Sequence, residues 1–179
     1  MVVGGERESK PDRGSIARGG AVLRTPDRRY SAPVEEPLPQ PVSRPASLEE
    51  WNARMASAIG QSIAMRIEEV SEERVVMTMP VDARVHQPWG ILHGGASLVL
   101  AESAASIGAG LNCPPGMRAV GQEINANHLR PKRDGVVRAV AEPLHVGRTS
   151  QVWSVEIRDE AGKLVCISRC TLAVIPAPD

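Results

Sequence analysis

The chain has 179 residues and carries 21 basic and 21 acidic side chains, with no Phe, one Tyr and three Trp. A formal net charge of zero and so few aromatic side chains disfavour nucleic acid or an anionic membrane surface as a partner. The length suits one domain with a real core, which must be built mainly from Val, Ile, Leu, Ala and Met.

The N-terminal segment differs in composition from the rest of the chain. Residues 1–46 are rich in Pro, Gly and Arg and poor in large apolar side chains, which predicts a disordered tail. Its acidic residues argue against an organelle transit peptide, and it lacks the apolar stretch of a signal peptide. We expect the folded domain to span residues 47–179, and a start codon assigned too far upstream is an alternative origin of the tail.

The first predicted elements are a short helix and a hairpin. Ser47 and Glu50 form a capping-box pattern, which predicts a helix that runs to about Ala58. Residues 62–69 and 73–81 alternate apolar and polar side chains, and this pattern is typical of two strands joined by a tight turn.

The longest apolar run of the chain lies in its middle. A loop over residues 82–92 leads into residues 94–110, whose small and branched side chains predict a helix packed on most sides. The remaining strand-like runs cover residues 117–129, 135–145, 149–158 and 163–175. Strands on both sides of one long helix predict an α+β fold, in which an antiparallel sheet of about five to six strands wraps around that helix.

Glu102 is the single Asp, Glu, Lys or Arg side chain between Arg84 and Arg118. A lone carboxylate in an apolar helix is costly to ionise unless something pairs with it or uses it, which is a first hint of function. The alternative is that Glu102 faces solvent on a narrow polar stripe. A membrane span would need about 20 mostly apolar residues, and this run is shorter and contains Glu102 and three serines.

The cysteines and histidines do not form a recognisable metal or disulfide pattern. Cys113, Cys166 and Cys170 are odd in number, which favours a reducing, cytoplasmic compartment, and the last two are expected to fill the core. The His and Cys spacings match no zinc motif, and no glycine-rich phosphate loop is present. We therefore expect neither a metal nor a cofactor.

Three segments together resemble a known family. They are Gln87-Pro-Trp-Gly-Ile-Leu-His-Gly-Gly95, then Ala101-Glu-Ser103, then Gly121-Gln-Glu-Ile-Asn-Ala-Asn-His128. This combination resembles the hotdog-fold acyl-CoA thioesterases, in the helix-glutamate branch that includes 4-hydroxybenzoyl-CoA thioesterase and 1,4-dihydroxy-2-naphthoyl-CoA hydrolase. The likeness covers about residues 47–175. It implies a homodimer, often paired into a homotetramer, with active sites between subunits.

The resemblance implies roles for five residues at the reacting centre. Glu102 is the expected nucleophile or general base, and the backbone N–H of Gly94 is the expected oxyanion donor. Gln87 and His93 are expected to orient the substrate carbonyl and support the loop. Ser106 lies one helical turn after Glu102, where it either positions the hydrolytic water or bonds back to the helix carbonyl.

The resemblance also implies contacts to the two halves of the substrate. Ser103 and Trp89 are expected to line the acyl site, although Trp89 is equally able to pack the loop. The phosphates of CoA require basic side chains and free N–H groups. Candidates for those contacts are His128, Arg130, Arg148, Thr149 and Ser150, each of which is also open to interpretation as an ordinary solvated residue.

These observations favour one activity over two others. The expected reaction is hydrolysis of an aryl- or medium acyl-CoA thioester to the free acid and CoA, with 1,4-dihydroxy-2-naphthoyl-CoA as one specific candidate. A non-catalytic acyl-CoA-binding module would keep the fold but would not need Glu102. An acyl-thioester hydratase or dehydratase would need a different arrangement of His and acid on the central helix. We expect acyl-CoA as the substrate, and neither nucleic acid nor a membrane as a partner.

Overall fold

The computed structural model describes residues 45–56 and 58–177, so most of the predicted tail lies outside the described residues. The helices are α1 (Leu48–Met55), α2 (Ala58–Ser62) and α3 (Gly94–Leu111). The strands are β1 (Arg66–Val70), β2 (Val75–Pro80), β3 (Met117–His128), β4 (Val136–Val146), β5 (Ser150–Asp159) and β6 (Leu164–Pro176).

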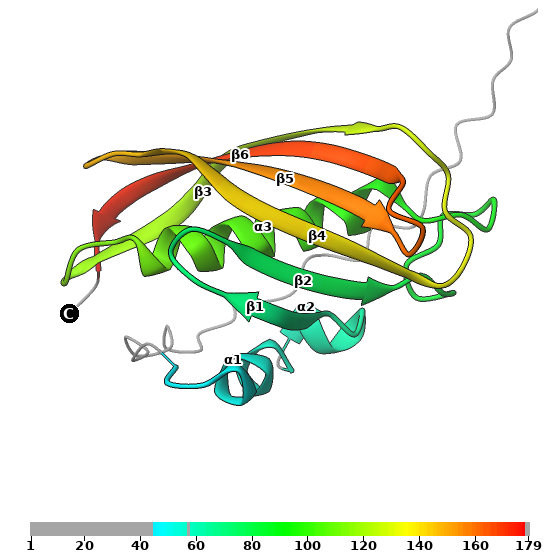
Figure 1. Ribbon diagram of the computed structural model, residues 1–179, viewed down its shortest axis with the longest axis horizontal. Helices are drawn as coiled ribbons and strands as arrows, with labels where there is room; N and C mark the ends of the chain where they lie inside the picture. Colours follow the sequence, from blue (N-terminus) through cyan, green and yellow to red (C-terminus); the bar gives the residue numbers. More distant parts are fainter. Residues whose placement is uncertain (1–44, 57, 178–179) are drawn as a thin grey trace, which may run out of the picture. The chain divides into compact units, whose positions relative to one another are not determined.

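The six strands form one antiparallel sheet in the order β1-β2-β4-β5-β6-β3 (Figure 1). β4, β5 and β6 follow one another as a meander, whereas β3 returns to pair with the far side of β6. β1 and β3 are therefore the two edge strands. The sheet curves around α3, which packs against β2, β3, β4, β5 and β6. This is the α+β arrangement that the sequence predicted.

Small side chains on α3 let the sheet approach the helix closely. The buried stripe of α3 consists of Ser97, Leu100, Ala101, Ala104, Ala105, Gly108, Ala109 and Leu111. By length and composition alone α3 could cross a membrane, but its packing against five strands is that of a core helix. The opposite stripe remains half-buried or exposed, and it consists of Val99, Glu102, Ser103, Ser106 and Gly110.

Trp153 on β5 fixes the last turns of α3. Its side chain is fully buried, and its indole N–H donates to Gln151 Oε1 at 3.1 Å. Gln151, also fully buried, donates through Nε2 to the carbonyl of Ala109 at 3.0 Å. A Cβ on Gly108 would lie 2.4 Å from the indole ring, so only glycine admits the ring at this place. One buried aromatic thus joins the sheet to the central helix.

The N-terminal helix caps the free edge of β1. The N-cap at Ser47 is confirmed, since the N–H of Glu50 donates to Ser47 Oγ at 3.2 Å, but the Glu50 carboxylate accepts from the N–H of Ala46 at 2.8 Å rather than from that of Ser47. The amide of Asn52 pairs with the backbone of Ile67 as a strand would, because its Nδ2 donates to the carbonyl at 2.9 Å and its Oδ1 accepts from the N–H at 2.8 Å. These bonds occupy backbone groups that an edge strand otherwise leaves open to other chains.

The predicted strand over residues 62–69 is wrong in its first part. α1 ends at Met55, a second short helix covers Ala58–Ser62, and β1 starts only at Arg66. Between them the N–H of Met65 donates to the carbonyl of Gly60, and Ala64 takes a φ of +53°. This left-handed turn ends α2. Four alternating residues carry too little periodicity to separate such a turn from a strand.

Candidate active site

The start of α3 leaves one backbone donor free. His93 is the N-cap, and its Nδ1 accepts from the N–H of Gly95 at 2.8 Å, so the ring proton resides on Nε2. The carbonyl of His93 accepts from the N–H groups of Ala96 and Ser97. Within residues 45–56 and 58–177, no group accepts from the N–H of Gly94. This N–H lies at the positive end of the helix dipole, where a developing oxyanion is stabilised.

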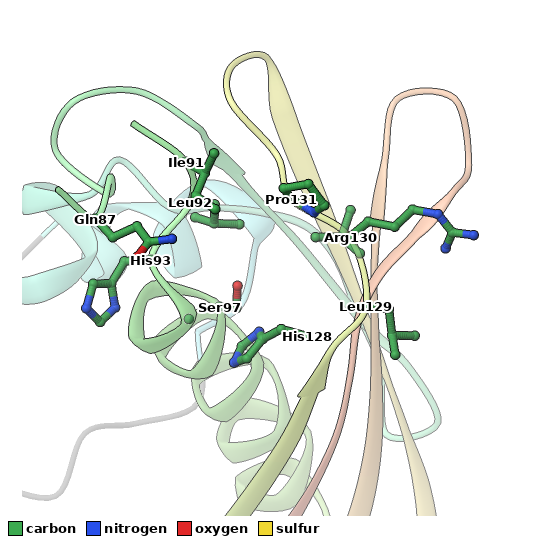
Figure 2. A pocket seen from close by; sticks show the side chains of 11 residues that line it. Gln87, Ile91, Leu92, His93, Ser97, His128, Leu129, Arg130 and Pro131 are labelled. Carbon is green, nitrogen blue, oxygen red and sulfur yellow. The ribbon is translucent and has the colours of Figure 1, made fainter. Parts of the chain in front are cut away.

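A cleft of about 410 Å³ opens beside this free donor (Figure 2). His128, at the end of β3, stands against the helix start, because a Cβ on Gly94 would lie 2.7 Å from its Nε2. Because Gly94 has no side chain, the His128 imidazole packs directly against the N-terminus of α3, and both line the same side of the cleft. The lining consists of Gln87, Ile91, Leu92, His93, Gly94, Ser97, His128, Leu129, Arg130, Pro131 and Val165.

The two loops around the cleft are tied together. The N–H of Leu92 donates to the carbonyl of Lys132 at 2.7 Å, and Nε2 of His86 bonds to the carbonyl of Arg133 at 2.7 Å. The ammonium of Lys132 in turn bonds to the carboxylate of Glu160 and lowers the pKa of that group to about 2. Glu160 is therefore ionised near neutral pH, and its ion pair with Lys132 links the turn between β5 and β6 to the loop that follows β3.

Gln87 and Trp89 belong to a tight turn above the cleft. The N–H of Gln87 donates to the carbonyl of Ile91, and the N–H of Gly90 donates back to the carbonyl of Gln87. Gly90 takes a φ of +71°, which suits glycine. Gln87 lines the cleft, whereas Trp89 stands at the tip of the turn with 78% of its surface exposed and does not line it.

Glu102 is exposed in the single chain and lies against β3. A Cβ on Gly121 would be 2.6 Å from its Oε1, and no donor among the described residues bonds to the carboxylate. The sequence raised burial of Glu102 as one possibility, but this chain alone does not bury it, because β3 is the edge of the sheet. Ser103 and Ser106 share the same open stripe and are half-buried.

Cys170 lies on the sheet beneath this stripe. Burial, together with the negative charges of Glu102 and Glu123, raises the pKa of its thiol to about 11. Cys166 and Cys170 are both buried on β6, as predicted for residues that fill the core. Their thiols remain protonated near neutral pH.

The predicted CoA contacts fall into two groups. His128 and Arg130 lie at the cleft, where Nη1 of Arg130 donates to the carbonyl of Leu164 at 2.7 Å. The second group, Arg148, Thr149 and Ser150, lies at the other end of the sheet. Along β6, His128 pairs with Cys166 and Ser150 pairs with Ala173, a separation of about 23 Å at 3.3 Å per residue. One chain does not bring the two groups together.

The structure places at the site residues to which the sequence assigned no role. The buried Ser97 lines the cleft beside Gly94, as does Pro131. Gly121 faces the Glu102 carboxylate. A glycine inside a strand pattern is a recognised sign of close approach by another group, so Gly121 could have been found. Ser97 and Pro131 carry no comparable signal.

Comparisons with known proteins place the chain in a family. The family described as Thioesterase superfamily matches residues 90–166. A 1,4-dihydroxy-2-naphthoyl-CoA hydrolase from Escherichia coli is 48% identical over 133 residues, which are 74% of this chain and 97% of that protein. A proofreading thioesterase from Cronobacter turicensis is 42% identical over 132 residues, which are 74% of this chain and 96% of that protein.

Solved structures point the same way. The crystal structure of a thioesterase from Haemophilus influenzae superposes with a TM-score of 0.72 at 43% identity, and the match covers 76% of this chain and 95% of that one. The resemblance to the hotdog-fold thioesterases is thereby confirmed. Similarity at this level over nearly the whole length of the relatives shows that the chain is an enzyme of the thioesterase superfamily.

Proposed function

We propose that the enzyme hydrolyses an acyl-CoA thioester to the free acid and CoA, with Glu102 and the N–H of Gly94 at the reacting carbonyl. The free N–H of Gly94 at the mouth of the cleft is the observation that carries this proposal. Such a donor stabilises the oxyanion that forms when a thioester carbonyl is attacked, and is worth about 3 kcal/mol, on the order of 100-fold or more in rate.

Two chemical routes fit the carboxylate of Glu102. As a nucleophile it bonds to the carbonyl carbon, the C–S bond breaks, CoA leaves as the thiolate, and water then opens the resulting anhydride. As a general base it takes a proton from water, whose oxygen attacks the carbonyl while CoA leaves. Both routes need Glu102 ionised. Ser106, one turn further along the open stripe, is the proposed ligand for the water.

The proposed site lies between two copies of the chain. Glu102 and Gly94 are eight residues apart on one helix, about 12 Å along its axis. A nucleophile and an oxyanion donor must both lie within about 3 Å of the reacting carbonyl, so the two groups of one chain do not serve the same thioester. The open stripe of α3 and the free edge of β3 offer a surface for a second copy. We propose a homodimer, paired into a tetramer.

This assembly would also bring the two basic groups together. If two β3 edges pair antiparallel, the end that carries Arg148, Thr149 and Ser150 in one copy approaches the end that carries His128 and Arg130 in the other. We propose that these residues bind the nucleotide half of CoA. Ser103 and the exposed Trp89 would then line the acyl site across the interface.

The proposed substrates are aryl- and medium acyl-CoA thioesters, including 1,4-dihydroxy-2-naphthoyl-CoA. The name and the 48% identity of the Escherichia coli relative support this choice. The three cysteines are free, which favours the reducing, cytoplasmic compartment that we propose.

The first expected result is thiol release from an acyl-CoA. Purified protein incubated with benzoyl-, naphthoyl- and medium-chain acyl-CoA should liberate CoA thiol, measured with a chromogenic thiol reagent. The corresponding free acids have no C–S bond to hydrolyse, so they should not be altered. Tight binding of acyl-CoA without thiol release from any of them would instead identify a binding module and overturn the proposal.

A second expected result concerns the Gly94 donor. Gly94→Pro removes the N–H, yet proline suits the first helical position, and His93 has the extended backbone, φ −70° and ψ 131°, that precedes proline. Gly94→Ala is the matched control, because it also adds a Cβ against His128 but keeps the N–H. Gly94→Pro should lower kcat on the order of 100-fold more than Gly94→Ala does. Equal losses would show that the N–H is not used.

The same variant tests whether the site is shared. Subunits of Glu102→Gln and Gly94→Pro, each with little or no activity alone, are mixed and allowed to exchange. Each mixed dimer would hold one site with both defects and one intact site. Random mixing should therefore restore about a quarter of wild-type activity. Absence of recovery, with exchange verified by mass spectrometry, would place both groups of a site in one chain.

A further inference from the structure

Gly121 on β3 is the residue against which the Glu102 carboxylate rests. A Cβ built on Gly121 would lie 2.6 Å from Glu102 Oε1 and 3.7 Å from its Cδ. Apart from the chain neighbours of Gly121, nothing else among the described residues comes within 4 Å of that position. The size of residue 121 therefore determines how closely the Glu102 carboxylate approaches β3.

The backbone gives no other reason for glycine at this position. Gly121 is not among the described glycines with positive φ, so a side chain would meet no conformational strain there. Glycine inside a strand is destabilising by roughly 0.5–1 kcal/mol relative to alanine. The ladder to β6 does shift register between Gly121 and Glu123, but a bulge without positive φ accepts other residues. Within one chain, space for the carboxylate is the remaining explanation.

We infer that Gly121 is a positioning residue: by lacking a side chain, it sets where the Glu102 carboxylate stands when it acts on the thioester. This inference rests on the proposed function. A methyl group at 121 would occupy that place, and the atom that must yield is the free end of the flexible Glu102 side chain rather than backbone. The substitution therefore spares the fold and displaces the reacting group.

Gly121→Ala should accordingly separate activity from stability. A displacement near 1 Å of a reacting group lowers the rate on the order of 100-fold, so kcat should fall by about this factor while KM changes far less. The melting temperature should stay the same or rise by a few degrees, because alanine restricts the unfolded chain. Gly110→Ala is the control, since Gly110 is on the same open stripe of α3 and a Cβ there meets nothing within 4 Å.

The Glu102→Asp background tests whether Gly121 acts through the carboxylate. The shorter aspartate withdraws from β3, so adding Gly121→Ala to Glu102→Asp should change the single-turnover rate little. A wild-type kcat in Gly121→Ala, or the same fold loss in both backgrounds, overturns the inference while the proposed function stands. A wild-type protein that releases no thiol from any acyl-CoA overturns both.

Discussion

Glu102→Gln should abolish thiol release while leaving the fold and acyl-CoA binding intact. Glutamine has the shape of glutamate but carries no negative charge, so it neither attacks a carbonyl nor takes a proton from water. A general base contributes on the order of 10³-fold to the rate, and loss of a nucleophile removes more. No donor among the described residues bonds to the carboxylate, so the substitution leaves no buried partner unsatisfied. The measurement is the steady-state rate with a thiol reagent, with binding followed by calorimetry.

The matched control for this variant is Glu123→Gln. Glu123 also lies near Cys170, on the edge strand, and its Oε1 accepts from Asn125 Nδ2 at 3.0 Å. Removing this negative charge alters the local field but takes no reacting group away, so thiol release should continue at a rate close to wild type. Equal losses in the two variants would show that Glu102 acts through its charge alone. Full activity in Glu102→Gln would exclude it from the chemistry.

Single turnover in heavy-oxygen water separates the two routes for Glu102. With enzyme in excess, a nucleophilic carboxylate passes one of its own oxygens to the product when water attacks the glutamyl side of the anhydride, and the Glu102 peptide then gains the heavy isotope. A general base leaves that peptide unlabelled and places the heavy oxygen in the released acid, as does an anhydride opened at its acyl carbon, so a labelled Glu102 peptide is the outcome that identifies the nucleophilic route. Mass spectrometry of the digested protein reads this directly.

The sequence was sufficient for features that repeat or that are local. The apolar run of α3 and the alternation in the four later strands predict those elements to within a residue or two. The capping box at Ser47 is likewise a short-range pattern. α2 was missed, because a left-handed residue at Ala64 has no signature in alternating side chains.

The site shows the same division between local and long-range information. That Gly94 begins α3 follows from sequence, but that its N–H alone stays unpaired depends on the ring of His93, which takes the N–H of Gly95. The exposure of Glu102 depends on β3 being the sheet edge, and this order arises from pairing between strands distant in the chain. Residue types therefore indicated the chemistry, whereas the separation of the reacting groups required the fold.

Trp153→Ala should produce the largest loss of stability in the chain. Truncating a fully buried tryptophan lowers the free energy of unfolding by about 3–5 kcal/mol. The change also removes the indole N–H that donates to Gln151, whose amide in turn holds the carbonyl of Ala109. Denaturant unfolding at fixed protein concentration measures the effect, because the proposed association of subunits would make the midpoint depend on concentration.

The effect of Gly108→Ala on the free energy of unfolding should have opposite signs in the wild type and in Trp153→Ala. In the wild type its new Cβ would lie 2.4 Å from the Trp153 ring, and such overpacking is destabilising by about 1–3 kcal/mol, more than the roughly 1 kcal/mol gained from helix propensity. In Trp153→Ala the ring is gone, so only the gain remains and the double variant should be more stable than Trp153→Ala alone. Gly110→Ala, which meets nothing, should be mildly stabilising in both backgrounds. If Gly108→Ala were stabilising in the wild type, the indole would not be held against α3, and Trp153 would not be what fixes the helix that carries Glu102.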